Sequence, residues 1–191
     1  MRDQLAEVFP GQAVIGEEMG GDLGDDTTGW AIDPIDGTSN FVLGLPIWGI
    51  SIGYVEQGRS VLGAIALPDL NLIVSAREQV GLRVNQQAVP DPRPRSPVKI
   101  LELGENDLET GPETDARAQA FREAGYSVVR YRCAVFALAM SALGRLNGYV
   151  EQGCGLWDIA AAEIICREAG LTVETARIAP GRYAVDARWP D

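Results

Sequence analysis

One stretch carries most of the information about how this chain folds and works: Asp33-Pro34-Ile35-Asp36-Gly37-Thr38-Ser39-Asn40-Phe41. The apolar run 30–32 before it predicts a buried strand that stops at Asp33-Pro34, because proline cannot donate to a strand ladder. Asp36 is expected on the same side as Asp33, and Gly37 lets the backbone approach a ligand closely. Thr38 and Ser39 favour the start of a helix.

This stretch allows two interpretations. Two carboxylates that can hold cations, beside free helix amides that can hold an anion, predict a site for a metal and a phosphate. The alternative is an Asx-type turn between strand and helix, in which both aspartates only cap the backbone. The spacing of the residues favours the two interpretations about equally. The charge of the surrounding sequence is the further observation that bears on them.

The distribution of charge favours a cation site. The chain has 191 residues, with 16 Lys and Arg against 27 Asp and Glu, and a formal net charge of -11. No Lys or Arg lies between Arg2 and Arg59. A solvated loop explains three acidic residues of this stretch that have Gly-rich surroundings: Asp22, Asp25 and Asp26. Three others flank apolar strands: Glu17, Asp33 and Asp36. Carboxylates held near a core are usually satisfied by a cation, and oxygen-only ligands select Mg²⁺, Ca²⁺ or Mn²⁺.

The composition excludes several classes of protein. The chain has no His, which removes the Ser-His-Asp triad, the Cys-His pair and the His-ligated zinc site. Its acidity argues against nucleic acid as a partner. We find no apolar run of about 18 residues that would cross a membrane and no signal-peptide pattern after Met1. Three irregularly spaced cysteines predict reduced core thiols in a soluble cytoplasmic protein: Cys133, Cys154 and Cys166.

A proline-rich segment, residues 90–97, divides the chain. Its four prolines forbid helix and strand and favour an extended connector. The runs before it that predict an antiparallel meander are 48–55, 61–67 and 70–76. Strands and helices alternate after it, and the expected helices are 112–124, 134–143 and 156–169. We therefore predict a β-rich lobe over residues 1–97 and an α/β lobe over 98–191.

Three motifs, taken in order, resemble the inositol monophosphatase family of Mg²⁺-dependent, lithium-sensitive sugar phosphatases. They are Gly16-Glu17-Glu18, the run from Trp30 to Phe41, and Leu156 to Ala161 with Glu168-Ala169-Gly170 closing the helix. The resemblance extends from Phe9 to about Val173. It implies a mixed α/β fold, an α+β layered sandwich with sugar-phosphatase topology. It also implies hydrolysis of a small, inositol-phosphate-like monoester, with Mg²⁺ activating water and stabilising the leaving alkoxide.

The resemblance also assigns roles to residues. It implies as metal ligands Glu17, Asp33, the Ile35 carbonyl, Asp36 and Asp158, and as the catalytic set Glu17, Asp33, Asp36, Thr38 and Asp158. The substrate-binding residues that it implies are Asp36, Gly37, Thr38 and Glu151. The amides of Gly37 and Thr38 would receive the phosphate, the Thr38 hydroxyl would orient the attacking water, and Glu151 would bind a substrate hydroxyl. Glu18 would contact the metal ligands without binding the metal itself.

Two of these residues also have plain structural interpretations. Without the resemblance, Asp158 fits a helix N-cap beside a core tryptophan. Glu151 fits an ordinary solvated strand end about equally well. Both alternatives stay open at this point.

The sequence departs from the family in three places. It begins at the expected end of the family's second helix, so an Asp that pairs with the Thr38 equivalent has no counterpart. Residues 132–134 read Arg-Cys-Ala where the family usually has Gly-Ser-Ala or Gly-Thr-Ala. The chain ends soon after 183–187, without the family's final helix. We therefore expect weak turnover and a homodimer that covers exposed sheet. Arg132 either binds an anionic group of the substrate or points to solvent.

Two rival functions remain. One is a degenerate family member that binds metal without catalysis and acts as an interaction protein. The other is a superfamily phosphatase with a different substrate, such as fructose bisphosphate, histidinol phosphate or a 3′-phosphonucleotide. The pair Asn40-Phe41 favours the inositol branch over the nucleotide branch.

Overall fold

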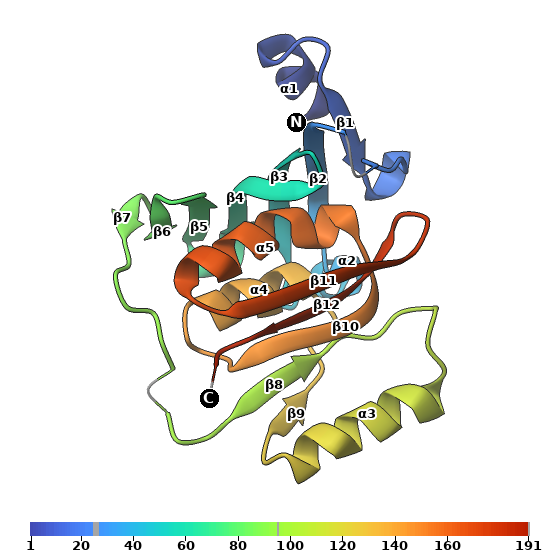
Figure 1. Cartoon of the computed structure of the whole chain (residues 1–191), viewed down its shortest axis with the longest axis vertical. Helices are drawn as coiled ribbons and strands as arrows, with labels where there is room; N and C mark the ends of the chain where they lie inside the picture. Colours follow the sequence, from blue (N-terminus) through green and yellow to red (C-terminus); the bar gives the residue numbers. More distant parts are fainter. Residues whose placement is uncertain (25–26, 95, 191) are drawn as a thin grey trace.

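The computed structural model describes residues 1–24, 27–94 and 96–190, and it contains two β-sheets (Figure 1). The first sheet has seven strands in chain order. They are β1 (Ala13–Gly16), β2 (Gly29–Asp36), β3 (Gly49–Glu56), β4 (Arg59–Leu67), β5 (Leu72–Arg77), β6 (Gly81–Val84) and β7 (Gln87–Ala88). β1 pairs in parallel with β2, and every later pair is antiparallel; the meander predicted for residues 48–76 is confirmed as β3, β4 and β5.

The second sheet has five strands in the order β11-β12-β10-β8-β9. They are β8 (Ile100–Leu103), β9 (Ser127–Val129), β10 (Gly148–Gly155), β11 (Thr172–Ala179) and β12 (Arg182–Arg188). β8 is parallel to both β9 and β10, whereas β12 is antiparallel to β10 and β11. This mixed arrangement agrees with the strand-helix alternation expected after the proline-rich segment.

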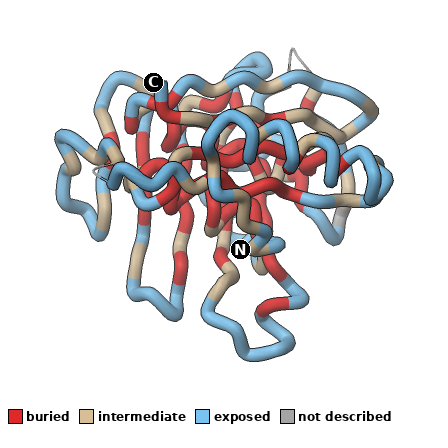
Figure 2. Tube along the Cα trace, turned by 90° about the horizontal axis from the view of Figure 1, so that it is seen from below, coloured by how far each residue is buried: buried red, intermediate tan, exposed pale blue. Residues whose placement is uncertain are grey.

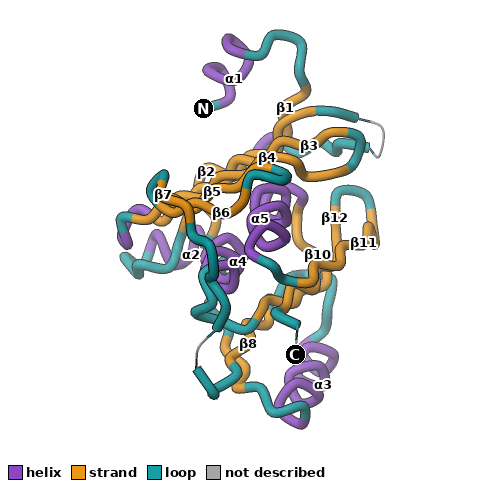
Figure 3. Tube along the Cα trace, turned by 60° about the vertical axis from the view of Figure 1, so that its left-hand side comes forward, coloured by secondary structure: helices purple, strands orange, loops and turns teal. Residues whose placement is uncertain are grey.

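Two helices, α4 (Ala134–Ala142) and α5 (Leu156–Ala169), lie between the sheets (Figure 3). α3 (Gly111–Glu123) lies beyond the second sheet and packs near β9. The short helices are α1 (Arg2–Val8) and α2 (Thr38–Val42), with 3-10 turns at Glu17–Met19 and Pro68–Leu70. The predicted layered sandwich is confirmed.

The core lies around α4 and α5, where buried residues gather in the middle of the molecule (Figure 2). α5 can approach β3 and β4 closely because both strands carry a glycine beneath it. A Cβ on Gly53 would lie 2.6 Å from the Ala161 nitrogen, and one on Gly63 would lie 2.4 Å from the Ala161 oxygen. Close helix-sheet contact therefore fixes where the first turn of α5 points.

The expectation that the strand before Pro34 stops there is wrong. β2 continues to Asp36, with a register shift between Asp33 and Asp36 against β3. Pro34 falls inside this irregularity, so its missing N–H costs no ladder bond. The bulge places both aspartates at the end of one strand.

The last strand of the first sheet ends at Ala88, and the second sheet begins at Ile100. Both sheets contribute residues to one hydrophobic cluster. The division at residue 97 into two domains stays a prediction. Within the described residues, no helix is long and apolar enough to span a membrane. The three cysteines are free and buried, as predicted for small core residues.

The acidic loop before β2 differs in part from its predicted solvated state. Asp22 is exposed, yet it forms an ion pair with Arg177 of β11, which connects the loop to the second sheet. Asp25 and Asp26 lie outside the described residues.

Candidate active site

Three aspartates from two distant segments meet at the end of β2. Asp33 and Asp36 come from the bulged end of that strand, and Asp158 comes from the first turn of α5. Carboxylate oxygens of the three lie within 4.8 Å of one another. We call Asp33, Asp36 and Asp158 the aspartate cluster.

Asp33 is the most deeply buried member of the cluster, with 1% of its surface exposed. Its Oδ1 accepts a hydrogen bond from the Ile35 N–H at 2.9 Å. Its Oδ2 is also buried and accepts no hydrogen bond from a described amide, hydroxyl or thiol; the Asp158 carboxyl lies beside the Asp33 carboxylate and would donate to it only when protonated. Burial raises the pKa of Asp33 to about 7, and the charges of Asp36 and Glu17 add to this increase.

Asp36 and Asp158 are held by backbone amides. The Asp36 Oδ2 accepts the Val135 N–H at 2.6 Å and lies 3.2 Å from the Cys133 Sγ, which donates to it. The Asp158 Oδ2 accepts the Gly155 N–H at 2.9 Å. Burial raises the pKa of both carboxyls. The N-cap of α5 is Gly155, so the N-cap interpretation of Asp158 is wrong; Asp158 is the third helical residue, accepts the Gly155 N–H and also joins the cluster.

The aspartate cluster fits a divalent cation. Three adjacent carboxylates with raised pKa values repel one another when ionised, and Asp33 keeps a buried oxygen without a described amide, hydroxyl or thiol donor. Hard cations such as Mg²⁺ take oxygen ligands of this kind. A bound cation would satisfy the free oxygen and neutralise the repulsion.

Two other predicted ligands lie around the cluster. Glu17 is exposed and lines a cavity that Asp36 and Asp158 also line, and its charge acts on Asp33. The Ile35 carbonyl accepts a hydrogen bond from the Thr38 hydroxyl at 3.0 Å. Glu18 is exposed. Their coordination of a metal stays a prediction.

The predicted phosphate-binding residues follow the cluster directly. Gly37 has φ 79°, and a Cβ there would lie 2.9 Å from the Ile47 oxygen and 3.0 Å from the Cys133 Cβ. Only glycine suits this position. Thr38 begins α2, and Gly37, Thr38 and the cluster members Asp36 and Asp158 line one cavity of about 270 Å³.

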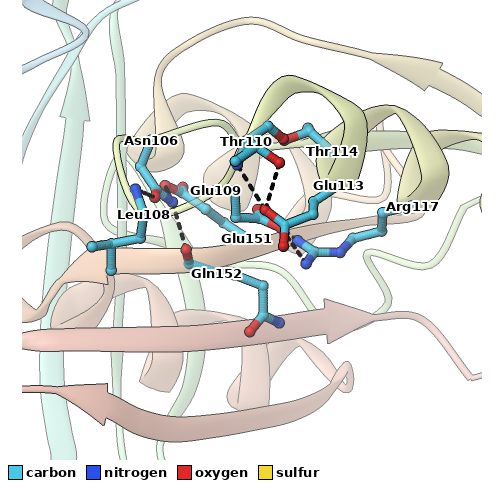
Figure 4. Close-up of polar contacts among 9 residues, drawn as sticks. All are labelled: Asn106, Leu108, Glu109, Thr110, Glu113, Thr114, Arg117, Glu151 and Gln152. Carbon is cyan, nitrogen blue, oxygen red and sulfur yellow. Dashed lines mark hydrogen bonds and ion pairs between the residues drawn. The ribbon is translucent and has the colours of Figure 1, made fainter.

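Glu151 lines the same cavity and is buried, with 7% of its surface exposed. The solvated strand end considered for it is therefore wrong. Asn106 donates to the Glu151 Oε1 at 2.9 Å and to the Gln152 carbonyl at 2.7 Å (Figure 4). The Tyr149 hydroxyl donates to the Glu151 Oε2. These two donors hold the carboxylate in a fixed position.

The loop that carries Asn106 is itself anchored. It ends in α3, where Glu113 caps the first turn by accepting both the Thr110 N–H and the Thr110 hydroxyl, at 2.8 and 2.7 Å. An ion pair between Glu109 and Arg117 fastens the same turn (Figure 4). Asn106 is thus a fixed donor rather than part of a freely moving loop.

Glu102, to which no sequence motif assigns a role, also lines the cavity. It is fully buried on β8 beside Tyr149 of β10, and its Oε1 accepts the Tyr131 N–H at 3.0 Å. Its Oε2 has no donor within the described part of the chain. Burial raises the pKa of Glu102 to about 8. The signal available in the sequence was a carboxylate between two leucines of a buried strand, Leu101 and Leu103.

Arg132 stands at the mouth of the cavity with 64% of its side chain exposed. Its guanidinium lies 3.9 Å from Glu105, and its backbone has φ 58°. The position where the family usually has Gly therefore keeps a glycine-like backbone here.

Comparison with known proteins places this geometry in a family. The chain matches the inositol monophosphatase family over residues 1–186. It is 39% identical over 94% of its length to the Sinorhizobium fredii protein y4fL, and 34% identical over 91% to the Mycobacterium tuberculosis inositol-1-monophosphatase SuhB. A Pasteurella multocida protein named Nus factor SuhB is 34% identical over 87% of the chain.

A solved structure of Mycobacterium tuberculosis SuhB has the same fold, with a TM-score of 0.80 and 31% identity over 99% of this chain and 75% of that one. The chain spans 64% of the length of the Sinorhizobium relative and 63% of the Mycobacterium one. The match over nearly the whole chain and the shared fold lead to one conclusion: the chain belongs to the inositol monophosphatase family.

Proposed function

We propose that the chain hydrolyses a small, inositol-phosphate-like phosphate monoester with Mg²⁺ as cofactor. The observation that carries this proposal is the aspartate cluster, two of whose members, Asp36 and Asp158, line one cavity with Gly37, Thr38 and Glu151, while the third, Asp33, lies buried beside them. The cavity thus combines groups suited to a cation, to a phosphate and to a hydroxyl.

In this proposal Asp33, Asp36 and Asp158 hold the cation, with Glu17 and the Ile35 carbonyl completing its ligands. Mg²⁺, when bound, supplies a Lewis acid that lowers the pKa of water and stabilises the leaving oxygen.

The remaining groups orient the substrate and the water. The Gly37 and Thr38 amides receive the phosphate oxygens, and the Thr38 hydroxyl holds the attacking water. Glu151, fixed by Asn106 and Tyr149, accepts a substrate hydroxyl. The chain has no His, and water attacking directly needs no covalent intermediate on the protein.

Phosphate release from inositol 1-phosphate, fructose 1,6-bisphosphate, histidinol phosphate and a 3′-phosphonucleotide tests the proposal. We expect release only with Mg²⁺, inhibition by Li⁺, and a loss of at least about 100-fold in Asp158→Asn. Asp115→Asn is the matched control, because Asp115 is exposed and pairs with Arg130 outside the cavity. Release that is equal in EDTA would refute the proposal, and Li⁺-insensitive release would argue against the inositol branch.

A second function is favoured by one comparison, the relative named Nus factor SuhB. In this alternative the chain binds metal through the same cluster and acts as an interaction protein without catalysis. Stabilisation by Mg²⁺ without phosphate release from any ester in the panel would support it.

We further propose that the chain is cytoplasmic and forms a homodimer. Within each copy, the lobes 1–97 and 98–191 would meet at the cavity. Apolar side chains next to the site are exposed in the single chain: Phe41, Val42, Leu43 and Leu45. A second copy would cover such a surface. Light scattering is expected to give twice the mass of the chain, and a monomer at micromolar concentration would contradict the dimer.

A further inference from the structure

The proposed function gives Arg132 no role, although contacts of the two residues next to it hold its backbone beside the cavity. On one side, the Tyr131 N–H donates to Glu102 at 3.0 Å and the Tyr131 carbonyl accepts from Asn40 at 2.8 Å. On the other side, Cys133 donates to Asp36 and packs against Gly37. Arg132 therefore lies between Tyr131, which is bonded to Glu102, and Cys133, which contacts Asp36 and Gly37.

The backbone of Arg132 is in the left-handed region, with φ 58°. Side chains other than glycine rarely adopt this conformation, and such residues gather at ligand-binding sites because surrounding contacts enforce them. Here the enforcing contacts are those of Tyr131 and Cys133. Any side chain at position 132 is consequently directed from a fixed point at the cavity mouth.

The guanidinium of Arg132 is also available for a ligand. Its recorded partner within the described residues is Glu105, at 3.9 Å, and Arg130 contacts the same carboxylate at 2.5 Å. The other cation of the cavity, Arg182, already donates to the Gly153 carbonyl at 2.8 Å and to Asp107 at 2.9 Å. The other ionisable side chains of the cavity that could face a ligand are carboxyl groups: Glu17, Asp36, Glu102, Glu105, Glu151 and Asp158.

We propose that Arg132 binds a second anionic group of the substrate, a carboxylate or a phosphate, and so selects monoesters that carry a negative charge besides the phosphate to be cleaved. The planar guanidinium suits both oxyanions because it can donate two parallel hydrogen bonds. A neutral polyol monoester would leave this cation unused. The inference rests on the proposed function, whose substrate class it narrows.

Two matched pairs of esters test it. Glycerol 1-phosphate and 3-phosphoglycerate differ only by a hydroxymethyl group against a carboxylate, and fructose 1-phosphate and fructose 1,6-bisphosphate differ by a phosphate. We expect kcat/KM to favour the partner with the second anionic group in at least one pair by about tenfold or more in the unmodified chain. The pair that shows the preference identifies the second group.

Variants assign this preference to Arg132. Arg132→Gly should fold, because glycine adopts a positive φ without strain, and its preference should fall to about one. Arg132→Lys should keep part of it, since ammonium is a point charge without the fork. Glu105→Gln should strengthen it by removing a competing carboxylate. Arg83→Gln, on β6 outside the cavity, removes the same charge and should leave it unchanged.

No preference in the unmodified chain, or an undiminished preference in Arg132→Gly, would overturn the inference while leaving the proposed function intact. Absence of hydrolysis of any ester with Mg²⁺ would instead defeat the proposed function. In that event calorimetric dissociation constants for the same four esters decide the inference. An Arg132-dependent difference of about tenfold supports it, and equal constants overturn it.

Discussion

Two buried carboxylates of this chain, Glu163 and Asp33, differ in how completely their oxygens are hydrogen-bonded. Glu163 of α5 accepts hydrogen bonds from Ser60 at 2.6 Å and Thr175 at 3.3 Å and pairs with Arg167 at 2.6 Å, so both its oxygens have partners. Asp33 has one backbone donor and one buried oxygen without a described amide, hydroxyl or thiol donor. A carboxylate with all its partners is explained by structure, whereas one that lacks a partner is suited to a ligand.

The largest effect on stability is expected from Glu163. Removing Glu163 leaves the buried Ser60 hydroxyl without its acceptor, while the exposed Arg167 returns to solvent, so Glu163→Ala should lower the free energy of unfolding by about 1–3 kcal/mol. Urea unfolding in EDTA measures this, and the stabilisation by Mg²⁺ should be the same in the variant. A loss below about 1 kcal/mol, or a changed response to Mg²⁺, would remove the distinction between the two carboxylates.

Glu102 is intermediate between these two, with one oxygen bonded to Tyr131 and one without a described donor. Its pKa is raised from 4.5 to about 8 by burial. Between these values the folded chain keeps a proton that the unfolded chain releases. The folded state then binds more protons, so the contribution of Glu102 to stability falls as pH rises through this window.

Glu102→Gln removes this titration. Because one proton corresponds to about 1.4 kcal/mol per pH unit, stability from pH 5 to 8 should fall less steeply in the variant by up to that amount. Urea unfolding of both proteins in EDTA at each pH gives the difference, which cancels the shared contribution of the aspartate cluster. Parallel pH profiles would contradict a protonated Glu102.

How much of the site the sequence could predict depends on how local the information is. Asp33, Asp36, Gly37 and Thr38 lie within one short stretch, and spacing alone could suggest their chemistry. Asp158 needed the resemblance, because the contact between α5 and the end of β2 depends on packing at Gly53 and Gly63 that no local pattern encodes. No local pattern predicts the bulge at Pro34, because a proline inside a strand is tolerated only where the register shifts, and the register depends on pairing with β3.

The residues around Glu151 in the cavity are less predictable from the sequence. Glu102 and Tyr149 become neighbours through parallel pairing of β8 with β10, which a sequence pattern does not specify. Asn106 acquires its role only when its loop folds back onto Glu151. The unusual backbone of Arg132 is imposed by contacts on both sides of it, and its exposed side chain resembles any solvated arginine in the sequence.

The central claim, that the aspartate cluster is a specific divalent-cation site, is tested most directly by unfolding the chain with and without Mg²⁺ at constant ionic strength. A cation at 100 times its dissociation constant should raise the free energy of unfolding by about 2.7 kcal/mol in the unmodified chain. Asp33→Asn should remain folded in EDTA and gain nothing from Mg²⁺. An equal gain in both proteins, or the same gain from NaCl, would contradict the account.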